Sequence, residues 1–249
     1  MKASRHEMMS SRGYDMTPTM YSPDGRIYQV EYAIETVKRG TLALGLKSKD
    51  GIILAVEEKS RSLQTANITQ KIFQVDRHIG IAAAGYIPDA RVQVDNARFF
   101  SQGNKLTYDE PVGVETVAKH LADQCHQFTQ YSGVRPFGVS LIVAGIDQLG
   151  ESVFITDPSG TFIPYAAIAI GSGADEVNAF LEKTYNEDMS LEDTAALAVA
   201  AINLKTDVKD GAKNIRIAKI SREKKVLEKV SDEEIEKYSQ IANQKFKQS

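Results

Sequence analysis

The sequence predicts an α+β domain in which two antiparallel sheets stack face to face and helices cover both outer surfaces, a four-layer αββα sandwich. Strand-like segments come in groups separated by pairs of helices, and grouped strands favour antiparallel sheets. Several strand candidates, such as Ile52–Val56, are apolar throughout, which is typical of strands buried on both faces. No linker and no repeat of solenoid period interrupts the chain, so residues 1–249 are interpreted as a single domain.

The first structured segment is predicted to be a turn followed by a helix, together covering 22–39. Ser22-Pro23-Asp24-Gly25 has turn chemistry, because proline presets φ and glycine accepts a positive φ. Gly40 is a helix stop signal. The helix has an apolar stripe at helical spacing, formed by Ile27, Val30, Ala33, Ile34 and Val37. The stripe alone favours docking on the chain's own core, while a second face could serve a partner through Tyr28, Glu31, Tyr32 and Glu35.

The remaining elements follow from hydrophobic periodicity and turn residues. Strands are expected at Thr41–Leu46, Ile52–Val56, Lys71–Val75, Ile79–Ala84, Val139–Ile146, Ser152–Thr156, Thr161–Pro164, Ala166–Ile170 and Asn214–Ser221. Helices are expected from Pro88 to Ser101, from Pro111 to Phe128, and over Ala174–Tyr185, Ser190–Lys205 and Ser231–Lys245. The last two begin with capping boxes, at Ser190/Asp193 and Ser231/Glu234.

Composition excludes several classes of protein. The net charge of −3 gives no general case for nucleic-acid binding, and no apolar run reaches membrane-spanning length. The one cysteine, Cys125, rules out an internal disulfide framework and is compatible with the cytoplasm. The four histidines form no ligand cluster, so no metal site and no cofactor is predicted. Gly171-Ser172-Gly173 lacks the rest of a phosphate-binding motif and is interpreted as a tight strand-to-helix turn.

The string Y-S-P-D-G-R-I-Y-Q-V-E-Y-A over 21–33 resembles the N-terminal signature of proteasome α subunits, and the archaeal type fits best. The resemblance extends to about Ile241. It implies the N-terminal nucleophile hydrolase fold, with a gate tail over 1–20, a helix segment over 22–39 and an αββα core over 41–249. It also implies a non-catalytic subunit of a seven-membered ring, which admits unfolded protein substrates to partner β subunits and docks the C-terminal tails of a regulatory ATPase ring.

The same resemblance implies three groups of site residues, each of which could instead be ordinary turn, surface or packing residues. The activator-binding group is Lys71, Gly40 and Glu31, with the lysine supplying a cation for a carboxylate. The gate group holds the tail through an aspartate and tyrosine hydroxyls: Tyr14, Asp15, Pro23 and Tyr32. The pore loop, which could equally be a plain helix-to-strand loop, contains Tyr131, Gly133 and Arg135.

An alternative function is a self-processed threonine peptidase that uses Thr41. Related β subunits cleave a Gly-Thr bond, so that the freed threonine amine can serve as the base. Gly40-Thr41 matches that bond, and Glu57 and Lys71 fall where its acidic and lysine partners would lie. The alternative requires removal of residues 1–40, here called the leader. In addition, the late Asp-Ser-Gly pattern of β subunits is missing from Asp207–Ala212. The sequence therefore favours an inactive Thr41.

Overall fold

The computed structural model describes residues 13–58, 63, 70–205 and 211–246. It confirms the two antiparallel sheets, and each has five strands in the described residues. The first sheet has the order β10-β9-β2-β1-β8, with bounds Leu227–Lys229, Ile215–Ser221, Gly51–Glu57, Ala43–Ser48 and Ala167–Ile170. The second has the order β3-β4-β5-β6-β7, with bounds Ile72–Asp76, Ile79–Gly85, Val139–Asp147, Gly150–Thr156 and Phe162–Pro164.

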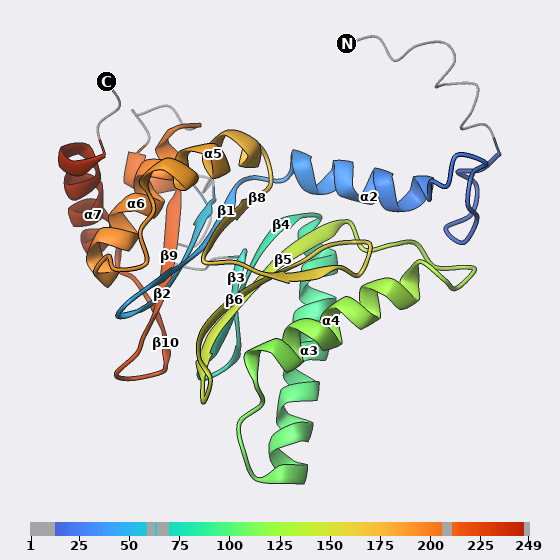
Figure 1. Cartoon of the computed structure of the whole chain (residues 1–249), viewed down its shortest axis with the longest axis horizontal. Coiled ribbons are helices and arrows are strands. Elements are labelled where there is room, and N and C mark those ends of the chain that lie inside the picture. The colour runs from blue at the N-terminus through green and yellow to red at the C-terminus, as the bar shows by residue number, and fades with distance from the viewer. Residues whose placement is uncertain (1–12, 59–62, 64–69, 206–210, 247–249) are drawn as a thin grey trace.

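Helices form the two outer layers, as Figure 1 shows. The first sheet is covered by α5 (Ala174–Thr184), α6 (Leu191–Asn203) and α7 (Asp232–Lys245), and the second by α3 (Ile87–Tyr108) and α4 (Val114–Phe128). The N-terminal helix α2 (Tyr28–Arg39) lies across one end of the sandwich and contacts β4 and β5. A short 3-10 helix, Gly211–Asn214, precedes β9.

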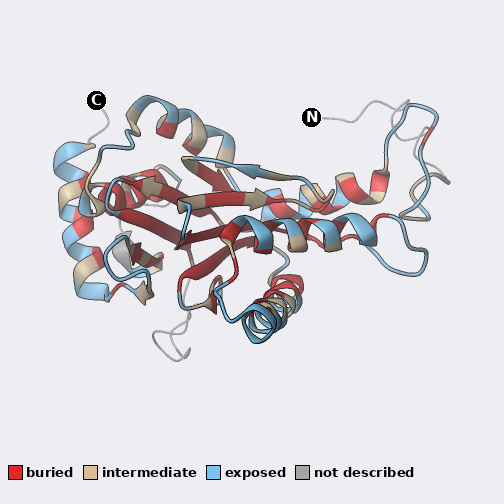
Figure 2. Ribbon diagram, turned by 60° about the horizontal axis from the view of Figure 1, so that its bottom comes forward, coloured by how far each residue is buried: buried red, intermediate tan, exposed pale blue. Residues whose placement is uncertain are grey.

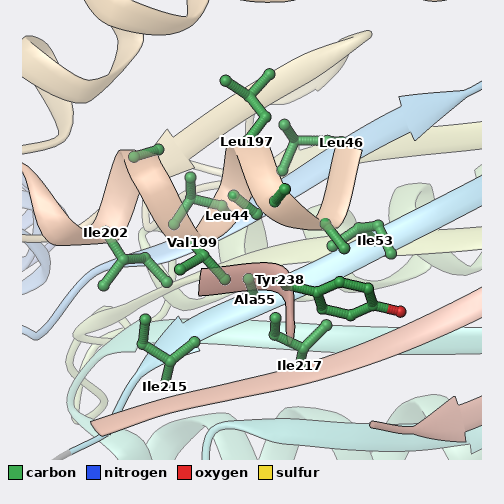
Figure 3. Packing of buried hydrophobic residues seen from close by; sticks show 14 of the residues in the cluster. Leu44, Leu46, Ile53, Ala55, Leu197, Val199, Ile202, Ile215, Ile217 and Tyr238 are labelled. Atoms are coloured by element: carbon green, nitrogen blue, oxygen red, sulfur yellow. The ribbon is translucent and has the colours of Figure 1, made fainter. Parts of the chain in front are cut away.

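Three apolar layers hold the sandwich together. One fills the space between the first sheet and α5–α7, and Leu44, Ile53 and Val199 belong to its buried cluster (Figure 3). A second lies between the other sheet and α3–α4, and a third lies between the two sheets. All seven residues of β2 are buried, as its continuous apolar run predicts. Figure 2 shows the buried strands in the centre and exposed residues along the outer helices.

Local sequence signals account for several helix boundaries. Both predicted capping boxes place a serine at the N-cap, where Ser190 Oγ accepts the Asp193 N–H at 3.1 Å and Ser231 Oγ accepts the Glu234 N–H at 3.2 Å. Gly171 and Gly173 have φ values of +101° and +77° in the turn between β8 and α5. The tight strand-to-helix turn expected there is confirmed.

Two expectations about helices were wrong. α3 continues to Tyr108 rather than ending near Ser101, because its second half extends beyond the sheets and has no apolar face toward the core to mark it in the sequence. It ends where Asp109 adopts a left-handed conformation with φ 56°. Tyr28, assigned to the partner-facing side of α2, is only 4% exposed and belongs to the buried side with Val30.

Candidate functional site

The junction between α2 and β1 joins the N-terminal leader tightly to the core. The Gly40 N–H donates to Val37 O at 2.9 Å, and Gly40 O accepts the Ser172 N–H at 2.7 Å. A Cβ on Gly40 would lie 2.2 Å from Gly85 N, so the two backbones touch at this point. Only glycine allows that approach, and both backbone polar groups of Gly40, its N–H and its carbonyl, are hydrogen-bonded within the fold.

Lys71 lies next to this junction, immediately before β3. Its Nζ donates to four oxygens: Thr41 Oγ1 at 2.7 Å, Thr41 O at 2.8 Å, Leu42 O at 2.9 Å and Glu57 O at 3.1 Å. The residue is 5% exposed, and burial lowers the pKa of its amine to about 7, opposed by the negative charges of Glu58 and Glu57. The structure therefore brings Lys71 and Gly40, predicted as one group, to the same junction.

Thr41 lies at the centre of this cluster, and its hydroxyl has hydrogen-bond partners on two sides. Thr41 Oγ1 donates its proton to Glu57 O at 2.9 Å and accepts a hydrogen bond from the Lys71 ammonium. Its amide nitrogen is bonded to Gly40, so it cannot serve as the terminal amine that activates such a threonine. With the leader attached, the cluster works as a structural link among the α2–β1 junction, β2 and β3.

Asp15 connects the segment before α2 to the helix itself. The Tyr32 hydroxyl lies 3.3 Å from Asp15 Oδ2, and Gln29 Nε2 donates to the Asp15 main-chain oxygen. Burial and the Asp15 carboxylate raise the pKa of Tyr32, so the phenol stays a hydrogen-bond donor at neutral pH. Two predicted gate residues, Asp15 and Tyr32, therefore meet within one chain, whereas no hydrogen bond, ion pair or ring contact joins Tyr14 or Pro23 to them in the described residues.

Glu31 lies apart from Lys71 within the chain. It pairs with Arg26, whose Nε donates to Glu31 Oε1 at 2.7 Å and whose guanidinium lies 5.0 Å from the centre of the Tyr28 ring. At about 1.5 Å of rise per residue, the helix separates it from Gly40 by roughly 13 Å. One copy of the chain does not bring Glu31 into the Lys71 cluster.

The loop between α4 and β5 has an exposed tip and a fixed base. Tyr131 is 61% exposed at the tip, and Gly133 has φ +85°. At the base, Arg135 Nη1 and Nη2 donate to the two oxygens of Asp89 at 2.6 and 2.8 Å, and Gly138 N–H donates to Asp89 Oδ2 at 2.9 Å. Arg135 therefore anchors the loop to the start of α3 through a two-pronged ion pair.

Comparison with known proteins now decides the family. The family model described as "Proteasome subunit" matches residues 37–220, and the model for the N-terminal signature of A-type proteasome subunits matches residues 14–35. The chain belongs to the proteasome subunit family. Its αββα sandwich is consistent with the N-terminal nucleophile hydrolase fold of that family.

Curated archaeal proteins named as proteasome alpha subunits resemble the chain over nearly its whole length. The protein of Archaeoglobus fulgidus is 43% identical over 95% of this chain and 96% of its own. Those of Methanosarcina acetivorans and Methanothermobacter thermautotrophicus are 43% and 44% identical, covering 96% and 91% of this chain and 98% and 92% of their own. The leader that carries Asp15, α2 and Gly40 thus includes the A-type signature of the proteasome family.

The structure also reveals residues that bind the candidate site residues and that the sequence did not indicate. The Ser172 N–H donates to the Gly40 carbonyl, and Asp89, in the first turn of α3, accepts the Gly138 N–H at the base of the 131–138 loop. Gln29 binds the backbone at Asp15. These contacts link residues distant in sequence, and a single sequence carries no signal for them. Among the described residues, no group of three or more candidate ligands could hold a metal ion, and no helix has the length and apolarity to cross a bilayer.

Proposed function

We propose that this chain is a non-catalytic α-ring subunit of a proteasome core particle. In this role, seven copies form a ring on each end of a stack, β-type subunits form the inner rings, and peptide bonds are cleaved on the β-type subunits. The observation that carries the proposal is the fit of Gly40 against Gly85 and Ser172, because it builds the leader into the fold. A leader fixed in this way leaves Thr41 without a free amine.

The leader has the features of a gate for unfolded protein. The contact between Tyr32 and Asp15 supports this role, because a hydrogen bond to a carboxylate can hold the preceding tail in one of two arrangements. In the gate, Tyr14 and Pro23 complete the group with residues of a neighbouring copy. The tail over 1–12 lies outside the described residues. The exposed Tyr131 and the loop anchored by Arg135 line the pore through which an extended chain passes.

Docking of a regulatory ATPase takes place at Lys71 and Gly40, with Glu31 contributed by the adjacent copy. The Lys71 ammonium already meets four oxygens, so an incoming C-terminal carboxylate must replace at least one of them. Because burial lowers the Lys71 pKa to about 7, docking should weaken as pH rises above that value and the cation is lost.

Three measurements test the proposal together. The intact mass of the purified chain should retain the leader, co-expression with a cognate β-type subunit should give a larger particle, and only that particle should hydrolyse peptides. Deleting residues 1–12 should raise unstimulated hydrolysis of a short peptide, with a substitution at exposed Lys183 as the control. If the chain alone hydrolyses peptides, the proposed non-catalytic role is overturned. If tail deletion leaves the particle's rate unchanged, the proposed gate is overturned.

A self-processed threonine peptidase is the second candidate, supported by the 2.7 Å contact between Lys71 Nζ and Thr41 Oγ1. Its test is the same mass measurement. A mature species beginning at Thr41 that cleaves peptides without a partner would establish this alternative.

A further inference from the structure

A cavity of about 390 Å³ lies where three hairpin turns meet the segment before α4, and we call it the hairpin cavity. The turns join β3 to β4, β5 to β6 and β9 to β10, and they contribute Arg77, Asp147 and Lys225 among others. Figure 1 shows the β5–β6 and β9–β10 turns in the lower part of the view, away from α2. The volume is typical of a site for a small molecule. The candidate site residues described above do not line this cavity.

The wall of the hairpin cavity carries an excess of positive charge. Its cations are Arg77, Lys224 and Lys225, and its one carboxylate is Asp147, whose two oxygens already accept main-chain N–H groups at 2.8 and 2.9 Å. Lys224 is paired with Glu228 at 2.8 Å. In the part of the chain that the structure describes, the Arg77 guanidinium has no ion pair, and the Lys225 ammonium donates only to Asp147 O at 3.2 Å. The wall therefore offers two cations that no carboxylate neutralises.

Lys225 has a backbone conformation that usually belongs to glycine. Its φ is 51°, and Asp109 is the other non-glycine residue with a positive φ among the described residues. The Lys225 N–H closes the β9–β10 turn by donating to Ser221 O at 2.8 Å. Glycine would adopt this φ at no steric cost, whereas a side chain is disfavoured there. The turn alone therefore gives no reason for a lysine, and its ammonium at the cavity wall supplies one.

The rest of the wall is held in place by the fold and is partly apolar. His78 is 8% exposed, and its Nε2 donates to Val112 O at 2.9 Å, because a carbonyl oxygen can only accept. The apolar part is formed by Pro111, Ile146 and Val226. A guanidinium binds a phosphate through two parallel N–H bonds. A phosphate dianion also matches two unneutralised cations, whereas a single carboxylate would balance only one of them.

We propose that the hairpin cavity binds the phosphate group of a small phosphorylated compound. The Arg77 guanidinium donates to two phosphate oxygens, and the Lys225 ammonium donates to a third. The carbon part of the ligand lies against Pro111, Ile146 and Val226. This site is separate from the junction at Lys71 and Gly40, and it stands whether or not the proposed function holds.

The test is calorimetric titration of the purified full-length chain at constant ionic strength. The probes are phenyl phosphate, inorganic phosphate and benzoate, which separate the dianion from the apolar part and from a single negative charge. Arg77→Gln removes the guanidinium, and Lys225→Gly removes the ammonium while giving the turn the residue that its φ favours. Lys183→Gln, at an exposed position of α5, removes one positive charge elsewhere as the matched control. The Tm of each variant is measured in parallel.

We expect the wild type to bind phenyl phosphate with a Kd below about 1 mM and to bind benzoate at least roughly tenfold more weakly. Arg77→Gln and Lys225→Gly should each weaken phenyl phosphate binding roughly tenfold, since each removes a charge-assisted hydrogen bond. Lys183→Gln should match the wild type.

The Tm of Lys225→Gly should equal or exceed that of the wild type, so that its loss of affinity cannot come from misfolding. Inorganic phosphate that binds as tightly as phenyl phosphate would support the phosphate contacts and overturn the part assigned to the apolar wall. Equal binding of benzoate and phenyl phosphate overturns the assignment to phosphate. Absence of binding, or full affinity in Arg77→Gln, overturns the site. None of these results bears on the proposed function.

Discussion

Replacing Lys71 by methionine separates the cost of burying its charge from the value of its hydrogen bonds. Methionine keeps most of the unbranched stem and removes the nitrogen. Leu42 O also accepts the Glu57 N–H at 2.9 Å, and Glu57 O also accepts the Thr41 hydroxyl at 2.9 Å. In the described part of the chain, the variant therefore leaves mainly Thr41 O without a donor, which costs about 1–3 kcal/mol.

The stability difference between wild type and Lys71→Met should depend on pH. The folded pKa of Lys71 is lowered to about 7, and an unfolded lysine titrates near 10.4 by reference values. Between those two values the unfolded chain holds one more proton, so raising the pH favours the folded wild type. The variant has no group that titrates there. From pH 7 to pH 8.5 the free energy of unfolding of the wild type should rise by about 2 kcal/mol relative to that of the variant, because each pH unit contributes about 1.4 kcal/mol.

Thermal unfolding of both proteins at pH 6.5, 7.5 and 8.5 measures this effect. For a chain of this length, about 1 kcal/mol corresponds to 2–4 °C in Tm. The difference in Tm between wild type and variant should therefore widen by roughly 4–8 °C between pH 7 and pH 8.5. Lys183→Met, which removes an exposed lysine, should show no widening. A gap that stays constant from pH 6.5 to 8.5 would refute the lowered pKa and show that the four oxygens keep the ammonium charged.

Three further substitutions probe the junction and the loop. Gly40→Ala should cost about 1–3 kcal/mol or prevent folding, because its Cβ would lie 2.2 Å from Gly85 N, and an unchanged Tm would contradict the close contact. Asp89→Ala should cost about 1–3 kcal/mol by leaving the Gly138 N–H without its acceptor, and limited proteolysis should show faster cleavage in the 131–138 loop; equal cleavage would argue against the anchor. Thr41→Ala should lower stability by about 1 kcal/mol and leave peptide hydrolysis by the mixed particle unchanged, whereas lost hydrolysis would point to catalysis at this position.

Much of the architecture could be predicted because it depends on short-range patterns. The apolar run of β2 and the serine caps of α6 and α7 are local signals, and each has the expected outcome in the structure. The second half of α3 could not be predicted in this way, since it packs on little and so lacks an apolar period toward the core. Helical periodicity also assigned Tyr28 to the wrong face of α2: its large ring is buried, although its neighbours on the helix surface are polar.

The candidate residues came from the sequence as residue types, and their functional roles stay predictions, whereas their geometry came only from the fold. Family resemblance indicated Lys71, Gly40, Asp15 and Tyr32. The structure places the Lys71 ammonium on the residue that follows Gly40, and the Tyr32 hydroxyl beside Asp15. The sequence could not show that the Lys71 ammonium binds main-chain oxygens, because such contacts depend on how three strands meet. Arg135 appeared as a pore residue, and only the fold shows its pairing with Asp89.

The closed turn ahead of α2 restricts where the N-terminus can change direction. Ser22 is 5% exposed, its N–H donates to Arg26 O at 2.9 Å, and its hydroxyl accepts the Arg26 N–H at 3.1 Å. Between this turn and Gly40, α2 packs on β4 and β5, so we expect this part of the leader to stay with the sheets. Any swing of the tail must therefore originate upstream of Ser22, and substitutions at 16–20 should alter the speed of opening more than those within the helix.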